Sequence, residues 1–188
     1  MKYKAKFLAA DIAECALFVV LMVAAAYVQI PFPLVPLTFQ TVISVLAGLL
    51  LGWKKGAASM AVYCFMGLVG LPVFTAGGGI AYVIKPSFGY IIGFIVSAAV
   101  GGLIAGNSKA SLKRYIIAAV CAFFIDYAVG IPYCMVCAKF LDVENLTNLL
   151  IVGNLVYMPK DAVLSILAAF LAKSVVPVIR KNKTGLKR

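Results

Sequence analysis

Long apolar stretches, separated by short breaks that carry proline, glycine or charge, run through almost the whole chain. A membrane-spanning helix needs about 20 mostly apolar residues, or fewer where protein shields part of it. Six stretches meet this requirement and predict six spanning helices over residues 7–29, 38–52, 56–71, 88–106, 113–139 and 147–173. We therefore expect an all-α integral membrane bundle, formed as a single domain by residues 1–188.

The composition supports this interpretation and excludes several classes of protein. Of the 188 residues, 64% are hydrophobic and 12% are charged. When Gly is counted in place of Tyr the apolar share is about 68%, against roughly 45–50% in soluble domains. A soluble chain of this length has too little interior to hide so much apolar surface. The composition excludes a soluble enzyme, a nucleic-acid-binding domain and a disordered chain.

The net charge of +11 reflects membrane topology, because the basic residues lie between the apolar stretches and at the chain ends. With a cytoplasmic N-terminus and six spans, 14 of the 17 Lys and Arg residues fall on the inner side. The exceptions are Lys85, Lys139 and Lys160. Because cytoplasmic loops carry an excess of Lys and Arg, we expect both termini to be cytoplasmic. Asp11 and Glu14 also interrupt the apolar core that a cleaved leader would need.

The sequence offers no catalytic or metal-binding constellation. It has no histidine, which excludes a His-based acid–base mechanism. Cys134 and Cys137 form a single C-x-x-C inside an apolar stretch, so we expect neither a zinc site nor a disulfide framework. No Gly-Lys-Ser/Thr phosphate loop occurs. If the protein drives uphill transport with ATP, a partner subunit must hydrolyse it, and we expect no cofactor.

The long third connection contains three consecutive glycines, Gly77, Gly78 and Gly79, followed by Lys85. Glycines let the backbone approach a ligand closely and let a segment move. One interpretation is a lid over an outward-facing pocket. The other is a flexible connection between two helices.

The sixth segment carries the polar residues Asn154, Tyr157, Lys160 and Asp161. Polar and ionisable side chains inside a span are costly, so each is a candidate site residue. Asn154 and Asp161 are seven positions apart and share a helix face, whereas Lys160 points about 100° away from Asp161. Alternatively, Lys160 and Asp161 only neutralise each other. Pro159 is expected to kink this helix.

The fifth segment carries a second intramembrane acid, Asp126, beside Tyr127. Asp126 either contributes to a ligand-binding site or pairs with a residue of a neighbouring helix. The tyrosine ring suits a flat ligand but equally suits simple packing.

The first segment has small residues at every fourth position, namely Ala5, Ala9 and Ala13. Such spacing lets another helix come close. This face docks a partner protein or packs within the bundle. Asp11 and Glu14 are expected in the first turns of this helix, where negative charge is favourable; a proton relay is the alternative.

Several motifs closely resemble the BioY family of biotin transporters, in order from about residue 9 to residue 172. They are VPLTFQT at 35–41, LAGLLLG at 46–52, GLVGLPVF at 67–74, PSFGYIIGF at 86–94, YAVGIPY at 127–133 and PKD at 159–161. The resemblance implies the substrate-binding, or S, component of an energy-coupling factor (ECF) transporter in the bacterial cell membrane. It also implies that such a subunit captures biotin outside the cell and is not itself an enzyme.

The resemblance further implies specific partners and contacts. A small-residue face of the first helix, here Ala5, Ala9 and Ala13, would dock on a membrane coupling subunit that binds two cytoplasmic ATPases. Asp161 or Asn154 would accept hydrogen bonds from the ureido N–H groups of biotin. Tyrosines such as Tyr90, Tyr127 and Tyr157 would cover its ring system.

Two positions depart from the family pattern. Pro86-Ser87-Phe88-Gly89-Tyr90 stands where Pro-Thr-Gly-Gly-Tyr is frequent. In the family's Pro-Gly-Asp-x-x-Lys motif, Lys160 replaces the Gly and Leu164 the Lys. Either Lys160 or Lys85 of the third connection would then pair with the ligand carboxylate. Another small carboxylate such as lipoate, an integral-membrane enzyme and a passive channel remain the alternatives.

Overall fold

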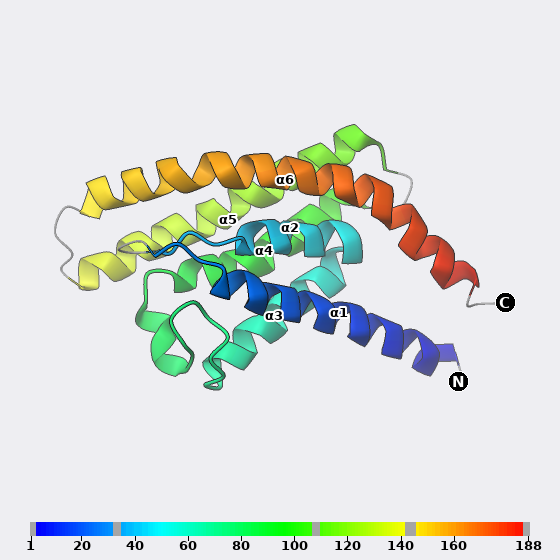
Figure 1. Ribbon diagram of the computed structural model, residues 1–188, viewed down its shortest axis with the longest axis horizontal. Helices are drawn as coiled ribbons and strands as arrows, with labels where there is room; N and C mark the ends of the chain where they lie inside the picture. Colours follow the sequence, from blue (N-terminus) through cyan, green and yellow to red (C-terminus); the bar gives the residue numbers. More distant parts are fainter. Residues whose placement is uncertain (1–2, 32–34, 107–109, 142–145, 186–188) are drawn as a thin grey trace.

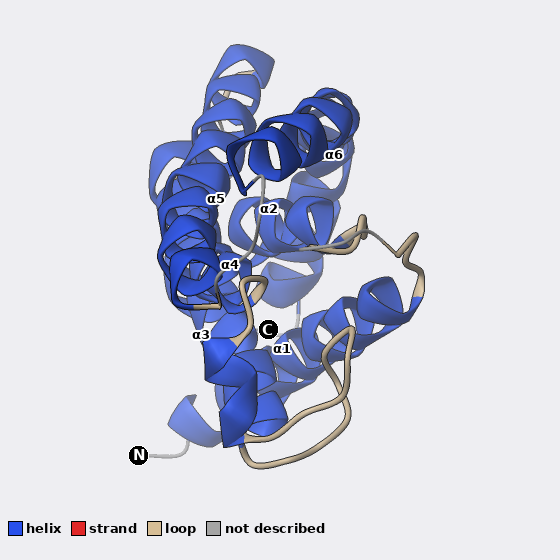
Figure 2. Ribbon diagram, turned by 90° about the vertical axis from the view of Figure 1, so that its left-hand side faces the viewer, coloured by secondary structure: helices blue, strands red, loops and turns tan. Residues whose placement is uncertain are grey.

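The computed structural model describes residues 3–31, 35–106, 110–141 and 146–185. Their regular structure is entirely helical, as predicted (Figures 1 and 2). The elements are α1 (Tyr3–Tyr27), α2 (Gln40–Leu51), α3 (Trp53–Leu68), the 3-10 helix η1 (Ile80–Ile84), α4 (Phe88–Ala105), α5 (Leu112–Phe140) and α6 (Leu146–Gly185).

Each predicted apolar segment corresponds to one α-helix, but two details differ. α6 continues to Gly185, beyond the predicted end at residue 173, and runs without interruption through Pro159 and Pro177. The prediction ended where apolar character ends, whereas helical hydrogen bonding continues into the charged tail. The third connection contains the 3-10 helix η1, which the sequence analysis did not predict.

The helices form an elongated bundle around α4, which packs against α2, α3 and α5. In Figure 1, α6 forms the upper edge and α1 with α3 the lower, and the start of α1 and the end of α6 lie at the same end of the bundle. α2 and α4 approach closely at Gly48, where any Cβ would overlap the backbone of Ala98. Backbones come this near only where side chains are small.

Two hydrophobic clusters divide the interior. One is rich in aromatic residues, including Tyr63, Phe74, Phe94 and Tyr127. The other is built mainly from alanines of α5 and α6 packed against Val45 and Leu49 of α2; its alanines are Ala105, Ala110, Ala118, Ala119, Ala122, Ala168, Ala169 and Ala172. Large rings leave gaps of irregular shape, whereas alanines let helices close together.

The outer surface is apolar along the helices. Four helical segments are long and apolar enough to cross a membrane, namely Ala9–Tyr27, Phe88–Ala105, Leu112–Phe140 and Tyr157–Ile179. Large side chains such as Phe124 and Phe170 are about half exposed on them. α2 has only 12 residues, and α3 has 16 and includes Lys54 and Lys55. The chain is a multi-pass membrane protein, because such an exposed apolar surface requires lipid.

The expectation for Asp11 and Glu14 was wrong in its geometry. α1 begins at Tyr3, so neither residue lies in its first turn. Both instead contact Lys55 of α3, with Nζ–O distances of 2.9 Å to Asp11 and 2.6 Å to Glu14. The two acids therefore tie α1 to α3 through one cation, a contact between segments that helix periodicity does not reveal.

Candidate ligand-binding site

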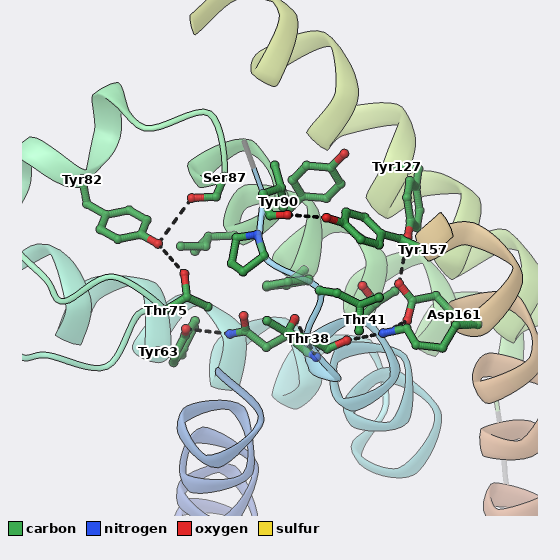
Figure 3. Close-up of a pocket in the computed structure, with 17 residues that line it drawn as sticks. Thr38, Thr41, Tyr63, Thr75, Tyr82, Ser87, Tyr90, Tyr127, Tyr157 and Asp161 are labelled. Atoms are coloured by element: carbon green, nitrogen blue, oxygen red, sulfur yellow. Dashed lines mark hydrogen bonds and ion pairs between the residues drawn. The ribbon is translucent and has the colours of Figure 1, made fainter. Parts of the chain in front are cut away.

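A cavity with an empty volume of about 510 Å³, counting its open mouth, lies within the aromatic half of the bundle (Figure 3). Its lining comes from the first connection, which joins α1 to α2, from the third connection, which joins α3 to α4, and from five helices. The lining residues are Val35, Pro36, Leu37, Thr38, Gln40, Thr41, Tyr63, Thr75, Tyr82, Ser87, Tyr90, Ile91, Phe94, Tyr127, Tyr157, Lys160 and Asp161.

An ion pair between neighbouring residues of α6 forms one corner of the cavity. Lys160 Nζ lies 2.8 Å from Asp161 Oδ1, and the Tyr127 hydroxyl donates to Asp161 Oδ2 at 2.8 Å. Lys160 also donates to the Thr38 carbonyl and lies over the Phe39 ring. Neighbouring helix residues point about 100° apart, but the flexible lysine side chain curls back to its acid. The pair therefore neutralises its own charge and also faces the cavity.

Tyrosine and phenylalanine side chains form the wall beside this ion pair. The Tyr90 and Tyr127 rings meet edge to face with their centroids 5.8 Å apart. Tyr157 donates its hydroxyl to the Val35 carbonyl at 2.6 Å, which ties α6 to the first connection. The predicted residues Tyr90, Tyr127, Tyr157, Lys160 and Asp161 thus come together around one cavity.

The opposite wall consists of polar residues that the sequence analysis did not propose as ligand contacts. Gln40 donates to the Tyr63 hydroxyl at 2.7 Å, and Tyr63 donates to the Val73 carbonyl at 3.1 Å. The Tyr82 hydroxyl lies 2.8 Å from Thr75 Oγ1 and accepts from Ser87 at 3.3 Å. These residues come from α2, α3 and the third connection, so only folding brings them together.

Part of the cavity lining could have been predicted from the sequence. Residues 35–41 carried the family resemblance, and six of the seven line the cavity. Thr38, Gln40 and Thr41 are polar side chains among apolar neighbours, a pattern that marks candidate site residues in a membrane protein.

The glycines of the third connection do not line the cavity. Gly77 and Gly79 have positive φ values of 98° and 106°, and the Gly79 N–H donates to the Gly67 carbonyl at 2.7 Å. The glycines thus shape a turn against the end of α3. The connection reaches the cavity through Thr75, Tyr82 and Ser87 instead. Whether it moves as a lid stays a prediction, as does a direct ligand contact for Gly77, Gly78 and Gly79.

Lys85 also lies outside the cavity lining. Its Nζ lies 4.9 Å from the centre of the Tyr82 ring and donates to the Ala76 carbonyl at 3.3 Å. Lys85 is therefore separated from the cavity by Tyr82, which lines it. A role in pairing with the ligand stays a prediction.

The five remaining residues of interest do not line the cavity in the part of the chain that the structure describes. The side chains of Asn154 and Ala5 are outside the part that the structure describes. Ala9 and Ala13 are exposed on α1, so this face does not pack within the bundle. Asp126 is fully buried, and neither of its oxygens has a hydrogen-bond partner among the described residues.

The sequence was compared with protein families and with known proteins. The sequence matches the BioY family over residues 1–181. The chain is 41% identical to a probable biotin transporter BioY of Lysinibacillus sphaericus over 171 residues, which is 89% of this chain and 87% of the relative. It is 33% identical to a probable biotin transporter BioY of Pyrococcus horikoshii over 166 residues, covering 88% of this chain and 95% of that one.

A solved structure shares the fold. It is the S-component for biotin from an ECF-type ABC transporter, with a TM-score of 0.69 and 23% sequence identity. The match covers 92% of this chain and 93% of that chain. The chain belongs to the BioY family, because the family matches it over residues 1–181 and a relative named as a probable BioY is 41% identical over 89% of its length.

Proposed function

We propose that this protein binds biotin with high affinity and is the substrate-binding subunit of an ATP-driven ECF-type vitamin importer. It is a transport subunit and not an enzyme. The observation that carries the proposal is a cavity lined by an ion pair and tyrosines, in a chain whose relatives are named biotin transporters.

The polar groups of the cavity match the groups of biotin. The ureido ring offers two N–H donors and one carbonyl, and the valerate tail ends in a carboxylate. Asp161 is an acceptor for the N–H groups, and the rings of Tyr90, Tyr127 and Tyr157 cover the fused rings. A ligand that lacks these groups leaves buried polar atoms unpaired, so the site discriminates strongly.

Lys160 is a cation among the residues that line the cavity, which supports a role in pairing with the ligand. Leu164 lies on the same helix and is not part of the lining. We therefore assign the pairing with the ligand carboxylate to Lys160 rather than Lys85. A charge-assisted hydrogen bond of this kind is worth about 1.5–3 kcal/mol.

Calorimetric titration of the purified chain tests the proposal. Biotin should bind with a Kd well below micromolar, and biotinamide, which lacks the carboxylate, should bind at least tenfold more weakly. Lipoate is the matched competitor, because it keeps a carboxylate tail and a sulfur ring but lacks the ureido group. A biotin Kd above micromolar, or tighter binding of lipoate, would contradict the proposal.

The topology and the partners belong to the same proposal. All six α-helices cross the membrane, both termini are cytoplasmic, and the face of Ala5, Ala9 and Ala13 docks on a coupling subunit that carries two ATPases. The common end of α1 and α6 in Figure 1 supports an even number of crossings. The exposure of Ala9 and Ala13 supports docking.

Cysteine labelling in intact cells tests the topology. In a background without the native cysteines, Lys85→Cys should react with a membrane-impermeant maleimide. Lys54→Cys should react only after permeabilisation. Equal labelling of both positions would refute the orientation.

A further inference from the structure

The third connection carries large apolar side chains on its outer surface. Ile80 and Ile84 of η1 are 74% and 64% exposed. Val69 and Leu71, where α3 passes into the connection, are exposed as well. Single apolar residues on a surface need no explanation, but several in one place indicate a surface that contacts something apolar.

η1 has one side toward the cavity and an apolar side away from it. A 3-10 helix has three residues per turn, so its side chains point in three directions. Tyr82 occupies one of these directions, where it is buried and lines the cavity. Ile80 and Ile84 occupy the other two directions, and both are exposed.

Hydrogen bonds on the inner side hold η1 in this orientation. The Tyr82 hydroxyl lies 2.8 Å from Thr75 Oγ1, and Tyr133 of α5 donates to the Val83 carbonyl at 2.6 Å. The Gly79 N–H, at the start of η1, donates to the Gly67 carbonyl at the end of α3. The apolar side of η1 is therefore fixed outward.

The end of α1 extends this apolar surface. Tyr27 donates to the Pro72 carbonyl and Gln29 to the Thr75 carbonyl, so the end of α1 lies beside the third connection. Its own large apolar side chains are exposed there too. We call the whole set the apolar rim: Tyr27, Val28, Ile30, Val69, Leu71, Ile80 and Ile84.

The apolar rim lies at the end of the membrane-spanning segments. The spanning segment of α1 ends at Tyr27, and that of α4 begins at Phe88. The Phe88 N–H donates to the Lys85 carbonyl at 3.0 Å, so η1 ends one turn before a spanning helix. In Figure 1, α5 and the start of α6 extend further along the bundle than the third connection, in green. This depth is that of the lipid head groups, where tyrosines such as Tyr27 are enriched.

Lys85 adds a positive charge at the edge of the apolar rim. Its side chain is exposed, directly after η1. Lysines at the edge of an apolar surface place their ammonium group at the level of the head groups, where lipid phosphates lie. A bilayer therefore complements both the apolar side chains and the charge, and it already covers the apolar surface of the adjoining helices.

We propose that the apolar rim, with the outer side of η1, is immersed in the head-group region of the lipid bilayer, and that Lys85 lies at the lipid phosphates. The third connection is then held between the cavity on one side and lipid on the other. Because Tyr82 lines the cavity while Ile80 and Ile84 contact lipid, the bilayer keeps this wall of the cavity in place. An effect of the bilayer on biotin affinity rests on the proposed function.

Fluorescence quenching by brominated lipids tests the contact with the bilayer. The chain has a single tryptophan, so Trp53→Phe gives a background without indole fluorescence and with all cysteines kept. Ile80→Trp or Ile84→Trp is added, and the full chain is reconstituted into liposomes. Both probes should be quenched roughly twofold more by lipids brominated near the head group than by lipids brominated near the chain end, and little by dissolved iodide.

Phe124→Trp in the same background is the matched control. Phe124 is exposed near the middle of the spanning helix α5, so it should be quenched more by bromine near the chain end. Strong quenching of both rim probes by iodide and none by bromine would place the connection in water and overturn the proposal. Protection from both quenchers would overturn it as well, because protein would then cover the rim. Ile80→Trp keeps the test decisive if Ile84→Trp does not fold.

Biotin titration in nanodiscs tests the effect on the cavity. The double variant Ile80→Ser, Ile84→Ser should bind biotin roughly fivefold more weakly than the wild type, although neither isoleucine lines the cavity. Ile117→Ser, Val178→Ser is the control, because these two residues are equally exposed on other helices. Wild-type affinity in the rim variant would contradict the coupling. Quenching by lipid without any biotin binding by the wild type would leave the contact standing and refute the proposed function instead.

Discussion

Asp161 contacts two other residues that line the cavity. Its side chain is almost fully buried, and it contacts Lys160 through Oδ1 and Tyr127 through Oδ2. One carboxylate thus orients a cation and a phenol that both line the cavity. Residues that position others in this way affect binding through geometry as well as through their own contacts.

We expect Asp161→Asn to weaken biotin binding about 10–100-fold, because a charge-assisted acceptor is lost where a hydrogen bond to a charged group is worth about 1.5–3 kcal/mol. Calorimetric titration measures the affinity. Val163→Ala is the control, since Val163 is exposed on the same helix. Unchanged affinity in Asp161→Asn would remove this carboxylate from the site.

The two candidate lysines can be separated by parallel substitutions. Lys160→Met should lower biotin affinity at least tenfold, whereas Lys85→Met should change it less than threefold, because Lys85 is exposed and lies behind Tyr82. Biotinamide should bind the wild type and Lys160→Met with similar affinity. The reverse ranking of the two variants would assign the carboxylate to Lys85.

At the scale of the elements, a few contacts between segments decide how the cavity is closed. Tyr157 joins α6 to the first connection. Tyr27 near the end of α1 donates to the Pro72 carbonyl at 2.5 Å, and Gln29 donates to the Thr75 carbonyl at 3.0 Å. Closer to the middle of α1, Lys55 links Asp11 and Glu14 to α3. α1 is thus anchored near its C-terminal end and near its middle.

We expect Lys55→Met to lower stability without changing biotin affinity. The three side chains are 18–26% exposed, so the loss should be about 1 kcal/mol, which corresponds to a Tm lower by about 2–4 °C. Thermal unfolding measures the change. Lys54→Met, at the exposed neighbour of Lys55, is the matched control. A Tm equal to that of the wild type would show that this link contributes nothing.

At the scale of the whole molecule, the bundle is asymmetric along its length. The cavity lies among large aromatic side chains, and the second core is built from alanines, which allow close helix contact. The cavity of the described residues therefore lies in the aromatic part of the interior.

We expect Ala9→Trp to prevent assembly with the coupling and ATPase subunits while leaving biotin binding by the isolated chain unchanged. The added indole would hold a partner helix away from the small-residue face. Co-purification measures assembly, and calorimetry measures binding. Val136→Trp adds bulk at an exposed position of α5 and should assemble normally. Normal assembly of Ala9→Trp would refute the docking face.

The helical membrane fold could be predicted from the chain's apolar segments alone, because lipid requires long apolar segments whose backbone groups are satisfied within each helix. The sequence also identified Tyr127, Tyr157, Lys160 and Asp161, because polar residues are conspicuous in apolar segments. These are properties of local composition and spacing, which can be read along the chain.

Which polar residues meet could not be predicted in this way, because it depends on how the helices pack. Gln40, Tyr63 and Tyr82 belong to separate segments, and their contacts depend on how α2, α3 and the third connection pack. The same holds for Lys55 with Asp11. The three consecutive glycines of the third connection suggested a segment close to the ligand. In the structure they shape a turn, and Thr75 and Tyr82 of the same connection line the cavity instead. Periodicity fixes the face on which a residue lies, but the neighbour of that face depends on helix packing across the whole bundle.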